Sequence, residues 1–204
     1  HRREDGYGMK PYMAEEAARD GVEAIITCDN GIAQFEAIQK AKALGLKVIV
    51  IDHHQVVRRE GKEVLPEADA IINPHQEACS YPFKGLCGGA LAYYFINYLY
   101  TISGKIETMD EDLIGFAALA TVCDVMELIG ENRDLVTCGL EQLNRSHNIG
   151  LNVLRDAAGI KGDIDAYHLG FILGPTINAA GRLDTAADGV ELFLTEDEDF
   201  AKKT

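Results

Sequence analysis

Residues 47–54 constrain the fold of this chain more than any other stretch. Four consecutive β-branched residues at 48–51 form an apolar run without polar alternation, which is typical of a strand buried on both faces of a parallel sheet. The run stops at Asp52, His53 and His54. Because open α/β sheets bind their ligands beyond the carboxyl ends of their strands, this cluster predicts a metal or phosphate site. The alternative is a polar loop whose histidines face solvent.

A second strand and a helix precede this run. Residues 23–27 form an apolar strand that is soon followed by Asp29, and residues 32–44 carry apolar side chains at helical spacing before Gly45. Strand, helix and strand predict a right-handed parallel βαβ unit. Asp29 and His53 then both lie just past carboxyl ends, so we expect them to meet although 24 positions separate them in the sequence.

The rest of the chain is predicted to be mainly helical after one more strand. Charged residues at 55–67 predict a solvated connection, and residues 70–72 predict a short strand that ends at Asn73. Residues 108–111 match a capping box before a helix at 113–123. Further helices are expected at 10–19, 91–99, 131–144, 151–157, 166–173 and 186–194, with the start of another at 195–198.

Three features of the helical part bear on ligand binding. Asp124 follows eleven mainly apolar residues, and a buried carboxylate needs a partner, either a bound cation or Arg133, unless it caps the next turn. Residues 175–182 are expected to form a loop of small residues that ends in an arginine, which suits an anionic group. The 91–99 helix is apolar on nearly all sides and is expected to be buried. Five tyrosines between positions 81 and 100 favour core packing over a surface that stacks bases.

The composition is that of a globular protein, with 47% hydrophobic and 25% charged residues and a net charge of −14. This charge counts against a general nucleic-acid groove on this chain, although carboxylates that hold divalent cations also make a sequence acidic. The apolar stretches are too short to span a bilayer and no signal peptide is visible, so we expect no membrane partner and a cytoplasmic location. Five cysteines without C-x-x-C spacing are expected to be reduced thiols.

Four motifs together resemble those of a known family: Asp-Asn-Gly at 29–31, Asp-His-His at 52–54, Thr-Val-Cys-Asp at 121–124 and Asn-Ala-Ala-Gly-Arg at 178–182. The chain resembles the DHH phosphoesterase superfamily and, within it, the RecJ type of single-strand-specific 5′→3′ exonuclease. Arg2 with residues 6–8, residues 82–88 and residues 174–175 favour that branch. The match spans essentially all 204 residues. It implies an α/β fold, with a parallel sheet flanked by helices, followed by a mainly helical part.

The resemblance implies a site that hydrolyses phosphodiester bonds with two metal ions, Mn²⁺ or Mg²⁺, and a metal-activated water as the nucleophile. Asp52 is expected to orient the imidazoles, and His54 is expected to border the scissile phosphate. The implied residues are Asp29, His53 and Asp124 as metal ligands, His54 and Asp52 as catalytic residues, and Arg2, Arg182 and Asn178 at the substrate phosphate. The implied partners are single-stranded DNA with a 5′ end and proteins of DNA repair and recombination.

The same resemblance divides the chain into parts. Residues 1–80 match the α/β part of the DHH domain, residues 81–185 match its helical part, and residues 186–204 match the start of a helix that connects to a further domain. The family's first strand, with its Asp-x-Asp-Gly motif, is expected upstream of Arg2, and domains that hold DNA are expected downstream. We therefore expect this chain alone to bind at most one metal ion weakly and to be nearly inactive.

Two alternatives stay open. A DHH enzyme of small substrates would hydrolyse nano-oligonucleotides, cyclic dinucleotides or pyrophosphate. A non-catalytic scaffold would keep the fold without the chemistry. The presence of Asp29, His53, His54 and Asp124 together speaks against the scaffold, because a scaffold has no need of ligand-type side chains at several separate points.

Overall fold

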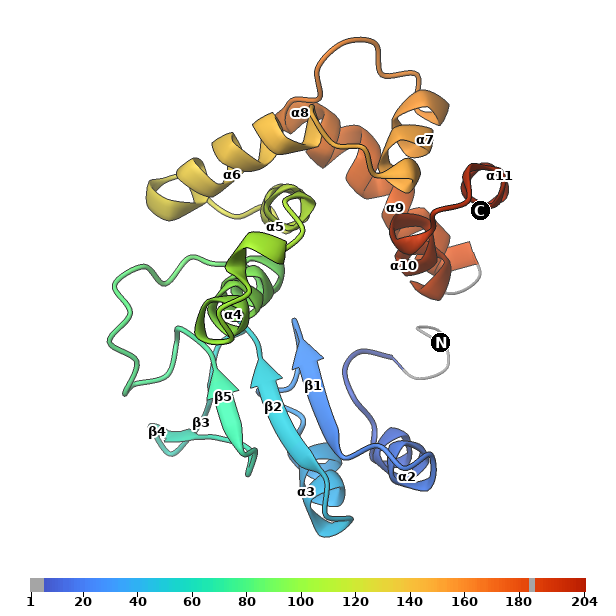
Figure 1. Ribbon diagram of the computed structural model, residues 1–204. Helices are drawn as coiled ribbons and strands as arrows, with labels where there is room; N and C mark the ends of the chain where they lie inside the picture. The colour runs from blue at the N-terminus through green and yellow to red at the C-terminus, as the bar shows by residue number, and fades with distance from the viewer. Residues whose placement is uncertain (1–5, 184–185) are drawn as a thin grey trace. The chain divides into compact units, whose positions relative to one another are not determined.

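The chain folds into two compact units, which Figure 1 draws as ribbons. The computed structural model describes residues 6–183 and 186–204. Residues 7–104 form the first unit, here called the α/β unit, and the residues from Lys105 onward form the helical unit. A parallel sheet with flanking helices, followed by a helical part, confirms the predicted fold class. The predicted boundaries at residues 80 and 185 stay predictions.

The α/β unit is built on a parallel sheet of three strands in the order β1-β2-β5. The register pairs Cys28 with Ile51 and Ile51 with Ile72, so the three carboxyl ends are level with one another. The strands are β1 (Ala24–Cys28), β2 (Lys47–Ile51) and β5 (Ala70–Ile72), and the last two confirm the predicted strands to the residue.

Helices pack against this sheet (Figure 1). They are α2 (Pro11–Arg19), α3 (Phe35–Ala43) and α4 (Gly88–Ile102). Helices α2 and α3 share one apolar core with the sheet, in which Ile38 and Val48 are fully buried. Helix α4 contacts β1 and β2, and its first residue, Gly88, lies against Asp29 just beyond β1.

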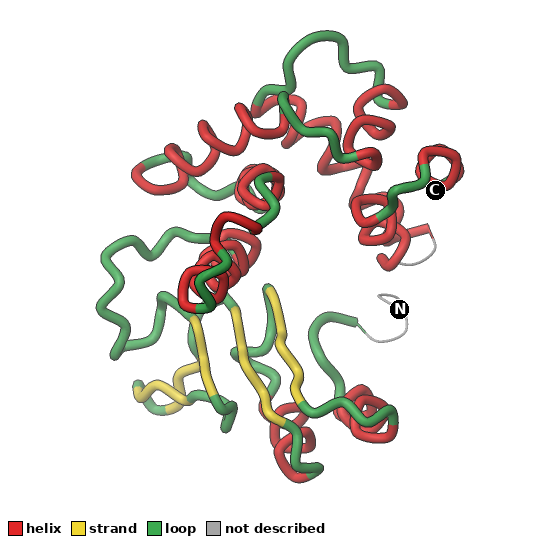
Figure 2. Tube along the Cα trace, in the orientation of Figure 1, coloured by secondary structure: helices red, strands yellow, loops and turns green. Residues whose placement is uncertain are grey.

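The connection between β2 and β5 is more ordered than its charge suggested. This solvated connection holds an antiparallel hairpin of β3 (Val57–Arg59) and β4 (Lys62–Val64), drawn in Figure 2 beside the three-stranded sheet. Glu60 and Gly61 form the turn, and both have positive φ angles, 51° and 79°. Two such residues match the twist of paired strands, which explains why a run of charges still forms a hairpin.

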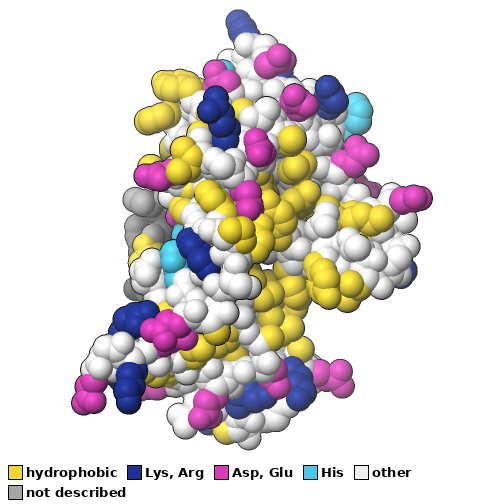
Figure 3. Space-filling model, turned by 90° about the vertical axis from the view of Figure 1, so that its left-hand side faces the viewer, with side chains coloured by type: hydrophobic (Ala, Val, Ile, Leu, Met, Phe, Trp, Pro, Cys, Tyr) yellow, Lys and Arg dark blue, Asp and Glu magenta, His cyan; other side chains and the backbone are white. Residues whose placement is uncertain are grey.

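Helix α4 is only partly buried, so the prediction of a buried 91–99 helix is wrong for its C-terminal half. Tyr98 is 63% exposed and Ile102 is 62% exposed. Tyr81, Tyr94 and Tyr98 line an apolar groove of about 860 Å³ between α4 and the loop that follows β5. Figure 3 views the side of the molecule that carries this loop, and hydrophobic side chains gather there. Core packing therefore does not account for these three tyrosines.

The helical unit is assembled around two closely packed helices, α5 (Asp112–Cys123) and α6 (Gly130–Leu143). Glycines make this approach possible, because a Cβ atom on Gly139 would lie 2.3 Å from the Ala118 Cβ. Leu119 and Leu143 join the apolar core that the later helices complete. The other elements are η1 (Ile106–Thr108), α7 (Ile149–Ala157), α8 (Ala166–His168), η2 (Leu169–Leu173), α9 (Gly174–Leu183), α10 (Ala186–Leu194) and α11 (Glu198–Lys203).

Residues 175–182 are helical, which corrects the predicted loop. Helix α8 continues through the π-helical turn η2 into α9, so Gly174 and Pro175 do not stop the helix. Pro175 lies just after the π-helical turn, which already interrupts the regular i→i−4 hydrogen bonds of the helix near the point where proline lacks its N–H. Gly174 packs against Cys123, since a Cβ atom there would lie 2.4 Å from the Cys123 Sγ.

Local hydrogen bonds also correct the predicted helix starts. Thr108 caps no helix, because its hydroxyl donates to the Lys105 carbonyl at 2.8 Å. Instead, a carboxylate oxygen of Asp110 accepts a hydrogen bond from the Asp112 N–H at the start of α5. Helix α11 is capped by Asp197 rather than by Thr195. Thr185, which directly precedes α10, lies outside the described residues.

Two further findings concern the predictions made from composition. Among the described residues, no helix has both the length and the apolar character needed to cross a membrane. All five cysteines lie among the described residues, and none of them forms a disulfide.

Candidate metal centre

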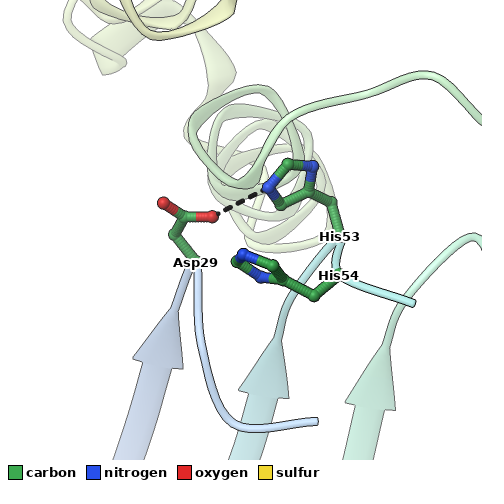
Figure 4. Close-up of side chains that lie close together, drawn as sticks. All are labelled: Asp29, His53 and His54. Carbon is green, nitrogen blue, oxygen red and sulfur yellow. Dashed lines mark ion pairs between the residues drawn. The ribbon is translucent and has the colours of Figure 1, made fainter. Parts of the chain in front are cut away.

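Three ligand-type side chains converge beyond the carboxyl ends of β1 and β2. Asp29, His53 and His54 each offer one ligand atom, and these atoms all lie within 4.8 Å of one another (Figure 4). The Asp29 Oδ1 lies 3.0 Å from the His53 Nε2. This confirms the prediction that Asp29 and His53 meet, and it adds His54 to the same group.

The backbone at Asp29 is in the left-handed region, with a φ of 61°. Residues other than glycine seldom adopt this conformation, although aspartate does so more readily than most, and such residues cluster at functional sites. Hydrogen bonds hold the turn: the Asp29 N–H donates to the Ile51 carbonyl at 2.9 Å, and the Asn30 side chain donates to the Cys28 carbonyl at 2.9 Å. The turn therefore ties β1 to β2 at the point where Asp29 meets His53.

Asp52 is 1% exposed and serves as a buried hydrogen-bond acceptor for its neighbours. One carboxylate oxygen accepts from the Ile32 N–H at 2.9 Å, and the other accepts from the His54 N–H at 3.1 Å and lies 2.7 Å from the His54 Nδ1. Burial raises the pKa of the Asp52 carboxyl, but the hydrogen bonds from Ile32 and His54 outweigh burial and leave the pKa below its ordinary value. Asp52 is therefore a carboxylate that fixes the His54 ring with its Nδ1 proton inward and its Nε2 outward.

Two residues to which the sequence assigned no role support the cluster. Asn73, which follows β5, is 2% exposed, and its amide donates to the His54 carbonyl at 2.9 Å. Gly88 leaves room for Asp29, because a Cβ atom there would lie 2.5 Å from the Asp29 Cβ. In the sequence, Asn73 is marked by the apolar run that it ends, and Gly88 by the pair of glycines at a helix start. Neither pattern indicates which residue is contacted in the fold.

The donor set fits a divalent cation. One carboxylate and two imidazoles are ligands that Mn²⁺ accepts, and carboxylates also bind Mg²⁺. Neighbouring ligands in an octahedral shell of about 2.1 Å radius lie about 3.0 Å apart, which is the spacing between the Asp29 and His53 atoms. Asp52 and the His54 Nδ1 form the carboxylate–histidine pair that commonly orients a metal-binding imidazole.

The remaining predicted site residues belong to the helical unit or lie outside the described part. Asp124 is exposed and follows the last residue of α5, and Val125 next to it has a φ of 57°, a strained value for a β-branched residue. Asn178 is exposed on α9, and Arg182 lies four residues further along the same helix, which places both on one face. The side chain of Arg182 and the whole of Arg2 lie outside what the structure describes.

Comparison with known proteins gives a consistent picture. Residues 3–121 match the family described as "DHH family, N-terminal domain". The chain is 38% identical over 212 residues to the "Single-stranded-DNA-specific exonuclease RecJ" of Dickeya dadantii and 36% identical over 194 residues to that of Bacillus subtilis. These alignments cover 97% and 95% of this chain but 35% and 23% of the two relatives. The chain thus spans about a third or less of the length of these curated relatives.

Solved structures with the same fold were determined with metal ions. An exonuclease RecJ bound to manganese is 30% identical with a TM-score of 0.83, and the match covers 100% of this chain and 49% of the other. RecJ of Thermus thermophilus in complex with Mn²⁺ is 27% identical with a TM-score of 0.78, covering 96% of this chain and 28% of the other.

Proposed function

The chain belongs to the DHH family, and from this premise we propose that it is part of the phosphodiesterase core of a 5′→3′ exonuclease specific for single-stranded DNA. The observation that carries the proposal is the convergence of Asp29, His53 and His54 at the ends of two parallel strands. The printed names of the relatives support single-stranded DNA as the substrate over the small substrates of other DHH enzymes. The 5′ end and partners in repair and recombination rest on the family resemblance.

In this proposal Asp29 and His53 hold a Mn²⁺ or Mg²⁺ ion, with His54 beside them at the scissile phosphate. Such an ion neutralises charge on a phosphodiester and lowers the pKa of a bound water. Asp52 keeps the Nδ1 proton of His54 in place, so the imidazole presents its Nε2 to the ion or the substrate. The strained turn at Asp29 aims a carboxylate at His53 without any rearrangement on binding.

Further residues of the proposed site are inferred from the family resemblance, most of them in the helical unit. Asp124 is proposed as a further metal ligand, and Asn178, Arg182 and Arg2 are proposed to bind the substrate phosphate. We further propose that this chain alone binds one metal ion weakly and hydrolyses little DNA. The described residues support this through a single group of three ligand side chains in the α/β unit.

The decisive experiment compares Mn²⁺ binding by the unaltered chain with binding by Asp29→Asn, measured by calorimetry and by the electron paramagnetic resonance of free Mn²⁺. Asparagine tolerates a positive φ, so this change removes the charge and keeps the turn. We expect an affinity loss beyond the roughly 10- to 100-fold that loss of an outer-shell partner costs. The matched control is Asp163→Asn, an exposed residue in a loop of the helical unit.

Identical isotherms for the unaltered chain and Asp29→Asn would contradict the metal site. The substrate is tested on the whole parent protein, with 5′-phosphorylated single strands and with dinucleotides as alternatives in the presence of Mn²⁺. Stepwise release of mononucleotides from the long strand is the expected result. Hydrolysis confined to dinucleotides would contradict the exonuclease and favour a small-substrate phosphodiesterase.

A further inference from the structure

The residue that follows the third strand carries a buried amide with two partners. Asn73 is 2% exposed. Its Nδ2 donates to the His54 carbonyl at 2.9 Å, and its Oδ1 accepts from the His75 N–H at 2.8 Å. One side chain thus joins the chain just beyond β2 to the chain just beyond β5. The amide supplies both the donor and the acceptor at these two points, whereas a carboxylate only accepts and an apolar side chain of similar size does neither.

Packing does not hold the His54 side chain, which is 61% exposed. Its orientation therefore depends on hydrogen bonds. Asp52 holds the ring and the backbone N–H from one side, and Asn73 holds the backbone carbonyl from the other. Asp52 is itself fixed by the N–H of Ile32, which belongs to the connection between β1 and α3. The position of His54 is in this way set by all three strand ends of the sheet.

We propose that Asn73 is a positioning residue of the metal centre, which acts through the backbone carbonyl of His54. This proposal rests on the proposed function, because it takes the group of Asp29, His53 and His54 as a metal site. Without the amide, the backbone of His54 keeps one anchor and the His54 imidazole samples orientations away from Asp29. The metal ion then has to order this imidazole on binding, and the cost of that ordering appears as lost affinity.

The test measures Mn²⁺ affinity in Asn73→Leu and Asn73→Ala. The first change keeps the branched shape of the side chain and removes both hydrogen bonds, and the second truncates the side chain at its Cβ. We expect a loss of about tenfold, the lower part of the range for outer-shell residues. The matched control is Gln76→Ala, whose half-buried amide donates to the carbonyls of Ile71 and Asn73 rather than to that of His54.

A double-mutant cycle with His54→Ala separates positioning from a general loss of structure. If Asn73 acts through His54, then removing Asn73 in the His54→Ala background costs little further affinity. The amide hydrogen of His54 in the metal-free chain gives a second measure, since we expect faster exchange in Asn73→Leu than in Gln76→Ala. Additive losses in the cycle, or equal effects of Asn73→Leu and Gln76→Ala on affinity, would overturn the proposal.

The unaltered chain provides a test that needs no variant to fold. On addition of Mg²⁺, the side-chain NH₂ resonances of Asn73 should shift more than those of Gln76. Equal shifts for the two amides would also overturn the proposal. Its failure is distinguishable from that of the proposed function, because Mn²⁺ binding that depends on Asp29 but not on Asn73 refutes only the role of Asn73.

Discussion

The two units place their predicted functional residues by different physical means. In the α/β unit, hydrogen bonds at the strand ends fix individual side chains, as the three bonds accepted by Asp52 illustrate. In the helical unit, Asp124 and Asn178 are carried by helices whose positions depend on close packing through glycines such as Gly174. A substitution at a strand end can therefore shift a single side chain, whereas a substitution between packed helices shifts a whole helix.

This difference predicts two kinds of response to substitution. Changes near the strand ends should alter metal affinity more than stability. Changes between packed helices should alter stability and leave the affinity of the folded chain unchanged. Two glycines, Gly139 in α6 and Gly88 in α4, allow the same substitution to be made in both settings.

The largest effect on stability is expected for Gly139→Ala. Its Cβ atom would lie 2.3 Å from the Ala118 Cβ and 2.7 Å from the Ile114 carbonyl oxygen, so α5 and α6 must separate. Overpacking of this kind costs about 2 to 3 kcal/mol of unfolding free energy. Urea denaturation followed by circular dichroism measures the loss, and Mn²⁺ affinity is measured where the chain is fully folded. A stable variant with weakened Mn²⁺ binding would break the comparison.

Gly88→Ala should lower Mn²⁺ affinity more than stability, the opposite of Gly139→Ala. Its Cβ atom would lie 2.5 Å from the Asp29 Cβ and 2.8 Å from the Asp29 Cα, so the strained turn at Asp29 has to shift. We expect Mn²⁺ affinity to fall about tenfold, as for other residues that support a metal ligand, and stability to fall less than in Gly139→Ala. Calorimetric titration of both variants under the same conditions makes the comparison direct. Unchanged affinity in Gly88→Ala would show that α4 does not set the position of Asp29.

The sequence predicted the sheet and the cluster at its edge because both depend on short-range patterns. The apolar runs at 47–51 and 70–72 stop abruptly at polar residues, and the parallel βαβ rule then brings Asp29 to His53. The register places the carboxyl ends of β1 and β2 next to each other, and this is sufficient to predict that Asp29 lies near His53. The helices at 113–123, 131–144 and 186–194 were likewise predicted from local signals, namely apolar runs, apolar periodicity and caps.

What the sequence missed depends on contacts between distant residues. Pro175 reads as a helix stop, and only the π-helical turn before it and the contact of Gly174 with Cys123 explain why α9 forms there. Asn73 and Gly88 support His54 and Asp29 across the fold, and no spacing rule connects them. The roles of Asp124, Asn178, Arg182 and Arg2 stay predictions from resemblance.

The same comparison can be made within the α/β unit, between two carboxylates at opposite ends of its sheet. At the carboxyl ends the carboxylate of Asp29 is proposed to hold a metal ion, whereas near the amino ends the carboxylate of Asp69 binds groups of the protein itself. Asp69 accepts hydrogen bonds from the Lys42 Nζ at 2.6 Å, the Val48 N–H at 2.8 Å and the Lys47 Nζ at 3.2 Å. Asp69 thereby links the end of α3 and the start of β2 to the start of β5.

Asp69→Asn should have the smallest effect, visible in the pH dependence of stability. The hydrogen bond from Lys42, with those from Val48 and Lys47, holds the pKa of the Asp69 carboxyl well below its ordinary value. A carboxyl with a lowered folded-state pKa stabilises the fold above its unfolded pKa of about 3.9, and this contribution is lost as the pH falls further. Asp69→Asn should therefore be less stable than the unaltered chain at pH 7, and the gap should narrow below about pH 4. Urea denaturation across this range checks the trend, with Asp163→Asn as the control. A gap that stays constant with pH would mean that the charge of Asp69 does not stabilise this end of the sheet.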